Sequence, residues 1–271
     1  MGEQASQRLN QYVAHDMASF LAAVAEVSRG FDNTKPWWRG QANADWRLVP
    51  SLYRGGLAKS ESNLNQRFRM MAPARYAGCP GNDDPFAWLF LMQHYGLPTR
   101  LLDWSESPLV ALHFALDTTA PSAADAALWG LSATGLNLHQ MHKQAICVPG
   151  NADSRPLGVE AFGPRTDSPD CRILSVVGQH SDLRHLVQQC AFTIHGAETP
   201  IDNLPDHDEY LAMIRIPAAA RPLFSAWLDL LGISSGVLFP DLEHLAAELR
   251  SMEFALPAEQ ALPAGGGKLV Q

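Results

Sequence analysis

The segment QHYGLPTRLLDWSESPLVALHFA occupies residues 93–115 and joins two helices whose ends are clearly marked in the sequence. An Asp-Pro pair begins a helix over 85–95, and a Gly-x-Pro pattern follows its last residue. A Ser-Pro pair begins a second helix over 108–116. The residues between the two helices, 97–106, are few, and they predict a compact connector rather than a separate module.

Outward from this segment, helices and strands are mixed without the regular alternation that is typical of a doubly wound sheet. Residues 149–170 are rich in Pro, Gly, Ser and Asp, and they predict a long surface loop. Apolar spacing predicts further helices over 17–29, 221–231 and 242–250. Apolar runs predict strands over 37–39, 126–131, 172–177, 189–195 and 210–216. We therefore expect an α+β fold with a mixed or antiparallel central sheet flanked by helices.

The last predicted helix carries an apolar stripe made of Leu242, Leu245, Ala246 and Leu249. These residues share one helix face, and a stripe of this kind ordinarily faces the core. We expect this helix to close the fold, with its leucines turned inward.

Composition excludes several classes of protein. The chain has 271 residues, of which 46% are hydrophobic and 18% charged, so it can bury a sizeable core and is not disordered overall. It has no apolar run of the roughly 20 residues that a membrane helix needs. The four cysteines are far apart and form no CxxC pair, which favours reduced thiols and a cytoplasmic protein. No histidine or cysteine group has the spacing of a metal site, so we expect no metal.

The net charge of −8 argues against DNA binding through bulk electrostatics. It leaves room for a local basic pocket that takes a phosphorylated small molecule. Such a pocket is suggested by the run Trp37-Trp38-Arg39-Gly40-Gln41. Arg39 can grip a phosphate through two charge-assisted hydrogen bonds, and Gly40 would let a ligand approach the backbone. The alternative is a structural arginine that is paired with a nearby acid.

A second group of polar side chains lies between the helices predicted over 85–95 and 108–116. His94, Tyr95, Thr99, Arg100 and Asp103 fall within ten residues, among Leu, Trp and Pro. Loops held by rigid elements often carry binding and catalytic groups. The alternative is that Arg100 pairs with Asp103, or that Asp103 caps the following turn.

The predicted strand over 189–195 alternates between two kinds of side chain. Residues 190, 192 and 194 would form an apolar face, and residues 189, 193 and 195 a face that can form hydrogen bonds. Such a strand can form the wall of a cleft, or it can be an ordinary strand with one wet side.

These stretches together resemble the FRG domain, a family named for its aromatic-Arg-Gly motif. The run WRGQ at 38–41, followed by WRLVPS at 46–51, is similar to the family's opening, and residues 93–115 look like its central signature. QCAFT at 189–193 and LFPDL at 238–242 resemble its later blocks. The resemblance implies an FRG domain over 36–251. The sequence on either side predicts an N-terminal helical extension over 1–35 and, from its glycines, a flexible C-terminal tail over 252–271.

The sequence also resembles NAD-dependent ADP-ribosyltransferases, though less closely. In those enzymes an arginine, usually followed by glycine, lies on the first core strand, and Arg39-Gly40 looks like this motif. Their second motif is a Ser/Thr-rich strand that leads into a helix of the form A-x-x-F-A, which residues 99–115 resemble. Their third motif is a strand that normally ends in glutamate, and here the sequence departs from the pattern, because the matching position is Gln189.

This second resemblance implies an enzyme that cleaves the nicotinamide glycosidic bond of NAD, which passes through an oxocarbenium-like state. It would transfer ADP-ribose to a protein or a nucleic acid, as a toxin or antiphage effector does. Asp103 or Gln189 would stabilise the developing cation or position the acceptor. His94 would serve as an acid, a base or a ribose contact, and Arg39 would hold phosphate.

The other implied contacts lie on the nucleotide. Tyr95 or Trp104 would flank the nicotinamide ring, and Gln41 or Thr99 would bond a ribose hydroxyl. The implied cofactor-binding set is Arg39, Gly40, Gln41, Tyr95, Thr99, Arg100, Trp104 and Ser105. Two other functions stay open: a non-catalytic FRG module that senses a nucleotide or phosphorylated ligand and signals to a partner protein, and an adaptor surface. The sequence leaves the oligomeric state open.

Overall fold

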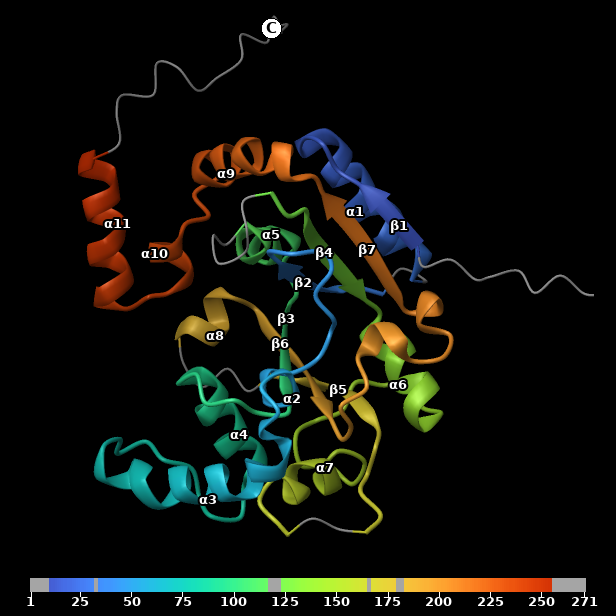
Figure 1. Cartoon of the computed structure of the whole chain (residues 1–271), viewed down its shortest axis with the longest axis vertical. Coiled ribbons are helices and arrows are strands. Elements are labelled where there is room, and N and C mark those ends of the chain that lie inside the picture. Colours follow the sequence, from blue (N-terminus) through green and yellow to red (C-terminus); the bar gives the residue numbers. More distant parts are fainter. Residues whose placement is uncertain (1–9, 32–33, 117–122, 165–166, 179–182, 255–271) are drawn as a thin grey trace, which may run out of the picture.

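The computed structural model describes residues 10–31, 34–116, 123–164, 167–178 and 183–254. A seven-stranded sheet runs through the molecule in the order β1-β7-β4-β2-β3-β6-β5 (Figure 1). Only β1 and β7 pair in parallel among these strands, so the sheet is mixed and the α+β expectation is confirmed. The strands are β1 (Asn10–Val13), β2 (Trp37–Gln41), β3 (Leu101–Ser105), β4 (Ala126–Leu131), β5 (Ile173–Val177), β6 (Cys190–His195) and β7 (Leu211–Ile216).

Helices cover both faces of this sheet, and those predicted over 17–29, 85–95, 108–116 and 221–231 are confirmed to within a residue at each end. The longer helices are α1 (Met17–Gly30), α3 (Glu61–Met71), α4 (Pro85–His94), α5 (Pro108–Ala115), α6 (Ala133–Met141), α9 (Arg221–Leu230) and α11 (Leu242–Phe254). The shorter ones are α2 (Ser51–Arg54), α7 (Arg155–Glu160), α8 (Leu183–Val187) and α10 (Ser235–Leu238). No helix in the described part of the chain is long and apolar enough to cross a bilayer.

Three apolar clusters form the core. One joins α1, α5 and α9 to the face of β2, β4 and β7 that carries Trp38. The second lies on the opposite face, around Trp37 and Trp129. The third packs α4 and α7 on β3, β5 and β6, where the rings of Phe90 and Phe192 lie 4.8 Å apart. Since β1 pairs with β7, and α1 contributes Phe20 and Val27 to the first cluster, residues 10–31 share the core of the rest of the chain.

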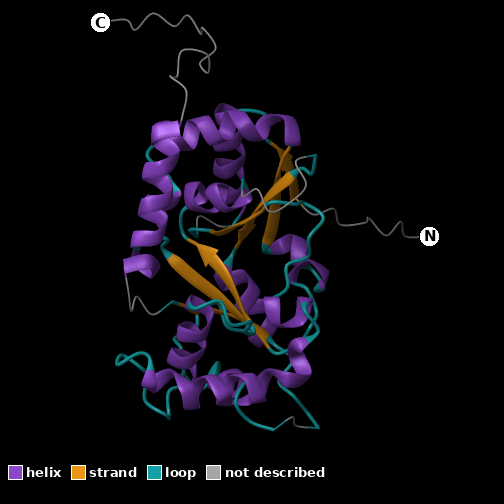
Figure 2. Ribbon diagram, turned by 60° about the vertical axis from the view of Figure 1, so that its left-hand side comes forward, coloured by secondary structure: helices purple, strands orange, loops and turns teal. Residues whose placement is uncertain are grey.

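The sheet is nearly divided at its centre. β2 pairs with β3 at a single position, Trp38 with Ser105, whereas β2 pairs with β4 along its whole length. The strands therefore fall into two groups, β1-β7-β4-β2 and β3-β6-β5, which Figure 2 shows turned relative to one another. Beyond the one shared pair, the facing edges of β2 and β3 separate.

Two loop predictions are wrong. The predicted connector over 97–106 contains β3, a central strand, because LLDWS is extended by pairing with β6, which is remote in the sequence. The predicted surface loop over 149–170 contains α7, whose Leu157 is fully buried. In both cases a short segment takes its structure from partners that local patterns do not reveal.

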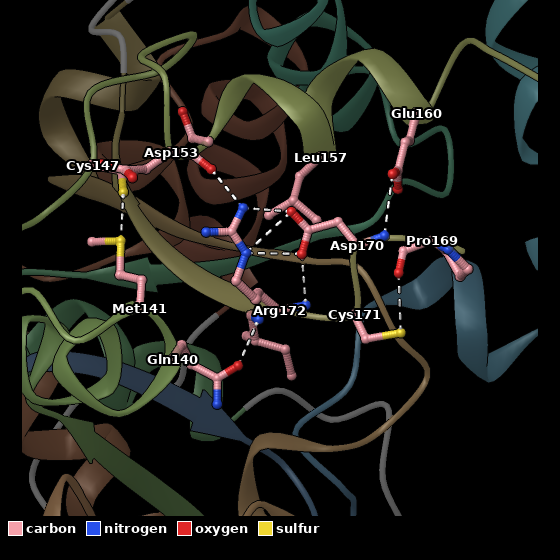
Figure 3. Close-up of polar contacts among 12 residues, drawn as sticks. Gln140, Met141, Cys147, Asp153, Leu157, Glu160, Pro169, Asp170, Cys171 and Arg172 are labelled. Atoms are coloured by element: carbon pink, nitrogen blue, oxygen red, sulfur yellow. Dashed lines mark hydrogen bonds and ion pairs between the residues drawn. The ribbon is translucent and has the colours of Figure 1, made fainter. Parts of the chain in front are cut away.

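Partly buried polar contacts fasten the 149–170 region to the start of β5 (Figure 3). Arg172, just before β5, binds both carboxylate oxygens of Asp170, with its Nη2 2.5 Å from Oδ2, and donates to the Asp153 carbonyl at 3.0 Å. The Glu160 carboxylate accepts the backbone N–H of Asp170 at 3.1 Å. Arg172 thus holds this segment at Asp170 and at Asp153, and the Glu160 bond closes the segment on itself.

The stripe of α11 is also oriented differently from the prediction. Leu242, Leu245 and Leu249 are 81%, 45% and 54% exposed. The half-buried side chains of this helix are instead His244 and Glu248. The predicted tail over 252–271 begins with the last three residues of α11, and 255–271 lie outside the described residues.

Candidate functional site

A cavity of about 270 Å³ opens where β2 and β3 separate, and we call it the β2–β3 pocket. It lies in the low-pairing centre of the sheet, between the start of α5 and the segment from α8 to β6. Its volume is close to the lower end of the range of roughly 300–1,000 Å³ that is typical of small-molecule sites. Its lining residues are Trp38, Arg39, Gly40, Gln41, Ala42, Trp46, Arg54, Gln93, Asp103, Trp104, Ser105, Ala111, Phe114, Arg184, Gln188 and Cys190.

The charge of this lining is opposite to that of the chain. Arg39, Arg54 and Arg184 come from three separate segments, and Asp103 is the one carboxylate among the described lining residues. The chain as a whole carries −8. A concave surface that concentrates guanidinium groups on an acidic protein attracts a compact anion such as a phosphate group.

Arg39 spans the gap between the two strands. Its Nη1 donates to the main-chain carbonyl of Asp103 at 2.7 Å, and thus replaces a ladder hydrogen bond that the separated strands cannot form. The same nitrogen lies 4.0 Å from Asp103 Oδ2. Burial lowers the pKa of Arg39 to about 10, Asp103 opposes this shift and Arg54 adds to it, so the group stays charged at neutral pH. Its buried Nε finds no hydrogen-bond partner among the described residues.

The carboxylate of Asp103 is held from the end of α4. Gln93 Nε2 donates to Asp103 Oδ2 at 2.8 Å, and Gln93 Oε1 accepts from the Thr99 hydroxyl at 2.5 Å. The Asp103 side chain is still half exposed. It is thus oriented by the protein while one side stays open to a ligand.

Aromatic rings supply much of the apolar part of the wall. Trp38, Trp104 and Phe114 are largely buried, whereas Trp46 is 37% exposed, on the segment that follows β2. A flat ring at the mouth of a basic pocket provides a surface on which a base or a nicotinamide ring can stack.

The opposite wall is fixed by the segment before β6. The Ser105 hydroxyl donates to the Gln188 carbonyl at 2.7 Å, and Gln188 Nε2 donates to the Leu238 carbonyl at 3.1 Å. The guanidinium carbon of Arg184 lies 4.7 Å from the ring centroid of Phe239. Arg184 of α8 and Gln188 just after it thus complete a pocket that begins on β2 and β3, and the end of α10 holds Gln188 in place.

The structure corrects the roles expected of Gly40 and Gln41, although both line the pocket. A Cβ on Gly40 would collide with the Ala111 carbonyl oxygen and would lie 2.5 Å from the Ala115 nitrogen. The glycine is therefore required for the close approach of α5 to β2, not for that of a ligand. The Gln41 amide accepts from Trp129 Nε1 at 2.8 Å and donates to the Arg47 carbonyl at 3.3 Å, so it is occupied inside the protein.

Thr99 and Arg100 are structural rather than ligand-facing. Thr99 is fully buried, and its hydroxyl bonds Gln93 and the backbone of Leu101. Arg100 Nε and Nη2 donate to the two carboxylate oxygens of Glu61 at 2.7 and 2.6 Å, in a buried bidentate pair. The predicted alternative, a pair between Arg100 and Asp103, is wrong as well.

Three other predicted residues also lie outside the pocket lining. Gln189 is exposed in a left-handed turn (φ 48°) just before β6, although its neighbours Gln188 and Cys190 line the pocket. Tyr95 is exposed and borders a separate apolar hollow formed by α3 and α4. His94 ends α4 with its ring 4.9 Å from that of Tyr95.

The hydrogen-bonding face of β6 is buried, so it is neither a wet side nor an open wall. Trp104 Nε1 donates to Thr193 Oγ1 at 3.2 Å, and Thr193 Oγ1 lies 3.0 Å from His195 Nε2. The Trp104 indole donates to the threonine hydroxyl, which in turn bonds the His195 ring, so the polar groups of this face are engaged with one another inside the protein. Burial lowers the pKa of His195 to about 3, with Arg39 and Arg100 contributing.

Of the predicted residues, the pocket brings together Arg39, Gly40, Gln41, Asp103, Trp104 and Ser105. The expected set missed Gln93, although it begins the 93–115 signature, and Arg54, which follows the WRLVPS run. It also missed Arg184 and Gln188. No sequence signal links Arg184 to β2, because α8 reaches the pocket only through the fold. Across the described ranges, no three His, Cys, Asp or Glu side chains gather closely enough to hold a metal ion.

Comparison with known proteins gives one match. Residues 34–124 match the family model of the FRG domain, so the chain carries an FRG domain over these residues, about a third of its length. The matched region contains β2, α4, β3 and α5, and thus both strands that form the pocket. No curated protein and no solved structure matches the chain.

Proposed function

We propose that this chain, which carries an FRG domain, uses the β2–β3 pocket to bind NAD, cleave its nicotinamide glycosidic bond and transfer ADP-ribose to a macromolecular acceptor. The observation that carries the proposal is the lining itself. Three arginines and four aromatic rings surround one carboxylate, Asp103, where the two strands separate.

The arginines supply the grip on the pyrophosphate. Arg54 is exposed at the mouth and can reorient, whereas Arg39 is fixed by Asp103. The buried Nε of Arg39, which has no protein partner in the described ranges, is a donor that a ligand oxygen would satisfy. Charge-assisted hydrogen bonds of this kind are the strong ones in phosphate recognition.

Asp103 is suited to the bond-breaking step. As the bond breaks, nicotinamide leaves with the bonding electron pair and positive charge develops on the ribose. A carboxylate held in place by Gln93 stabilises that charge without having to reorganise. The acceptor nucleophile then bonds to the ribose carbon, and its proton passes to water.

Two variants and one control test this function. Arg54→Ala should weaken NAD binding about tenfold, because it removes a charge-assisted contact from an exposed position. Asp103→Asn should keep NAD binding and lower nicotinamide release by about a hundredfold. Arg29→Ala, at an exposed arginine on α1 outside the pocket, should leave both unchanged. NAD affinity that survives Arg54→Ala, or release that survives Asp103→Asn, would refute the proposal.

A second function, binding without catalysis, is favoured by the acidic residues that the described lining lacks. No glutamate lies among the described lining residues, and Gln189, which stands at the matching position, lies outside the pocket. The pocket would then bind the nucleotide without cleaving it and would report it to a partner protein. NAD binding that is lost in Arg54→Ala, together with no nicotinamide release from the unmodified chain, is the outcome expected of this sensor.

A further inference from the structure

The leucine stripe of α11 is turned out from the protein. Leu242, Leu245 and Leu249 are all exposed, and Val237 of α10, the helix against which α11 packs, is 49% exposed beside them. Figure 1 shows α11 at the outer edge of the molecule, beyond α9 and α10. An apolar stripe of this regularity normally faces a core.

The orientation of α11 is fixed by its other face. The ring of His244 stacks on that of Phe239, with centroids 4.4 Å apart and an angle of 14° between the planes. Asp241 caps the start of the helix by accepting from the His244 backbone at 2.9 Å and holds its ring at 2.8 Å. Phe239 in turn packs against Phe114 and Arg184 of the β2–β3 pocket. The leucines therefore face outward because the opposite side of α11 is attached.

The spacing of the stripe is that of a helix-pairing seam. Leu242, Leu245 and Leu249 are separated by three and then four residues, and Met252 continues the pattern in the sequence. Positions that alternate in this way stay on one side of a paired helix. The stripe therefore has the spacing that packs against a second helix.

The charges beside the seam select the kind of helix. Between 241 and 254 the sequence has four carboxylates and one arginine. Asp241 and Glu243, at the start of the helix, are exposed, although Asp241 also bonds His244. Glu248 is half-buried and lies against Gly236 of α10. Paired helices place charges beside the seam opposite each other. Two copies of this chain would oppose acid to acid, and each copy carries −8.

We propose that the outward leucine stripe of α11 is a docking face for a basic amphipathic helix of a partner protein. Leucines of that helix would pack on Leu242, Leu245 and Leu249, and lysines or arginines beside them would face the exposed acids at the start of α11. The contact is independent of the nucleotide chemistry proposed for the β2–β3 pocket.

Two synthetic helical peptides, three heptads long, test this surface on the full chain by fluorescence anisotropy. Both have leucine at the seam positions; one has lysine and the other glutamate at the flanking positions. The lysine peptide should bind at least about tenfold more tightly than the glutamate peptide. The double variant Leu245→Asp/Leu249→Asp should lose that binding by a similar factor, since two buried leucines are removed from the contact.

The control is Met70→Asp, which changes an 81% exposed apolar side chain on α3 and should leave peptide binding unchanged. Because all three positions are exposed, circular dichroism should be the same for every variant. Several results would overturn the proposal: no binding of the lysine peptide, equal binding of the two peptides, or equal loss in Met70→Asp. A concentration-dependent dimer that Leu245→Asp abolishes would also overturn it, because a second copy would then cover the stripe. Much tighter peptide binding after removal of residues 255–271 would overturn it as well, because the C-terminal end of the chain would then be what covers the stripe.

Discussion

Gln93 bonds Asp103 through its amide nitrogen, at 2.8 Å, while its amide oxygen accepts from Thr99. The end of α4 thereby fixes a carboxylate on β3. Replacing Gln93 with leucine should lower nicotinamide release about tenfold or more, because a hydrogen bond to a charged group contributes about 1.5–3 kcal/mol. NAD affinity should change little, which separates this positioning role from binding.

The matched control for this change is Gln66→Leu, which removes a glutamine that bonds the Phe162 carbonyl and is not part of the pocket lining. It should leave nicotinamide release intact. If Gln93→Leu and Gln66→Leu behave alike, Gln93 has no special relation to the chemistry of Asp103.

Arg100 should behave as a structural residue. Arg100→Met leaves the buried carboxylate of Glu61 without its bidentate partner, and we expect the free energy of unfolding to fall by about 3–5 kcal/mol. The double variant Arg100→Met/Glu61→Leu removes both charges and should recover much of this loss, as measured by urea denaturation. Because neither residue lines the pocket, the double variant should still bind NAD. A double variant that folds but does not bind NAD would show that Arg100 contributes to the binding site.

Gly40 should be intolerant of even one added carbon. Gly40→Ala forces α5 away from β2 and should cost about 3 kcal/mol or more, which thermal unfolding would show as a large drop in Tm. Gly30, the last residue of α1, has nothing within 4 Å of a built Cβ. Gly30→Ala should change stability by less than about 1 kcal/mol, in the stabilising direction. Equal effects at the two glycines would contradict the packing account.

His195 should make the fold sensitive to acid. Its pKa is about 3 in the folded protein, because the ring is buried and positive charges lie near it, whereas an unfolded histidine has a pKa near 6.5. Between these values the unfolded chain binds more protons, so stability falls as the pH drops from about 6.5 toward 3, by up to about 1.4 kcal/mol per pH unit. His195→Gln should flatten this slope in urea titrations between pH 7 and 5, and an unchanged slope would show that His195 is not its source.

Local patterns in the sequence were sufficient to predict the elements whose ends are marked by capping residues and prolines. α4 and α5 begin at Asp-Pro and Ser-Pro pairs, where the cap and the fixed φ of proline act within one turn. β4 and β7 could be predicted because continuous apolar runs are buried on both faces of the sheet. The motif around Arg39 and the 93–115 signature contain the residues of β2 and β3, the two strands of the pocket.

Only the tertiary structure determined which of those polar residues meet. Arg39 and Asp103 lie 64 positions apart, and their contact exists because β2 and β3 pair once and then separate. Arg100, three positions before Asp103, points instead to Glu61, and the leucines of α11 point outward because His244 is held against Phe239. Side-chain identity fixes what a group can bond, but the group it reaches depends on strands and helices packed from distant parts of the chain.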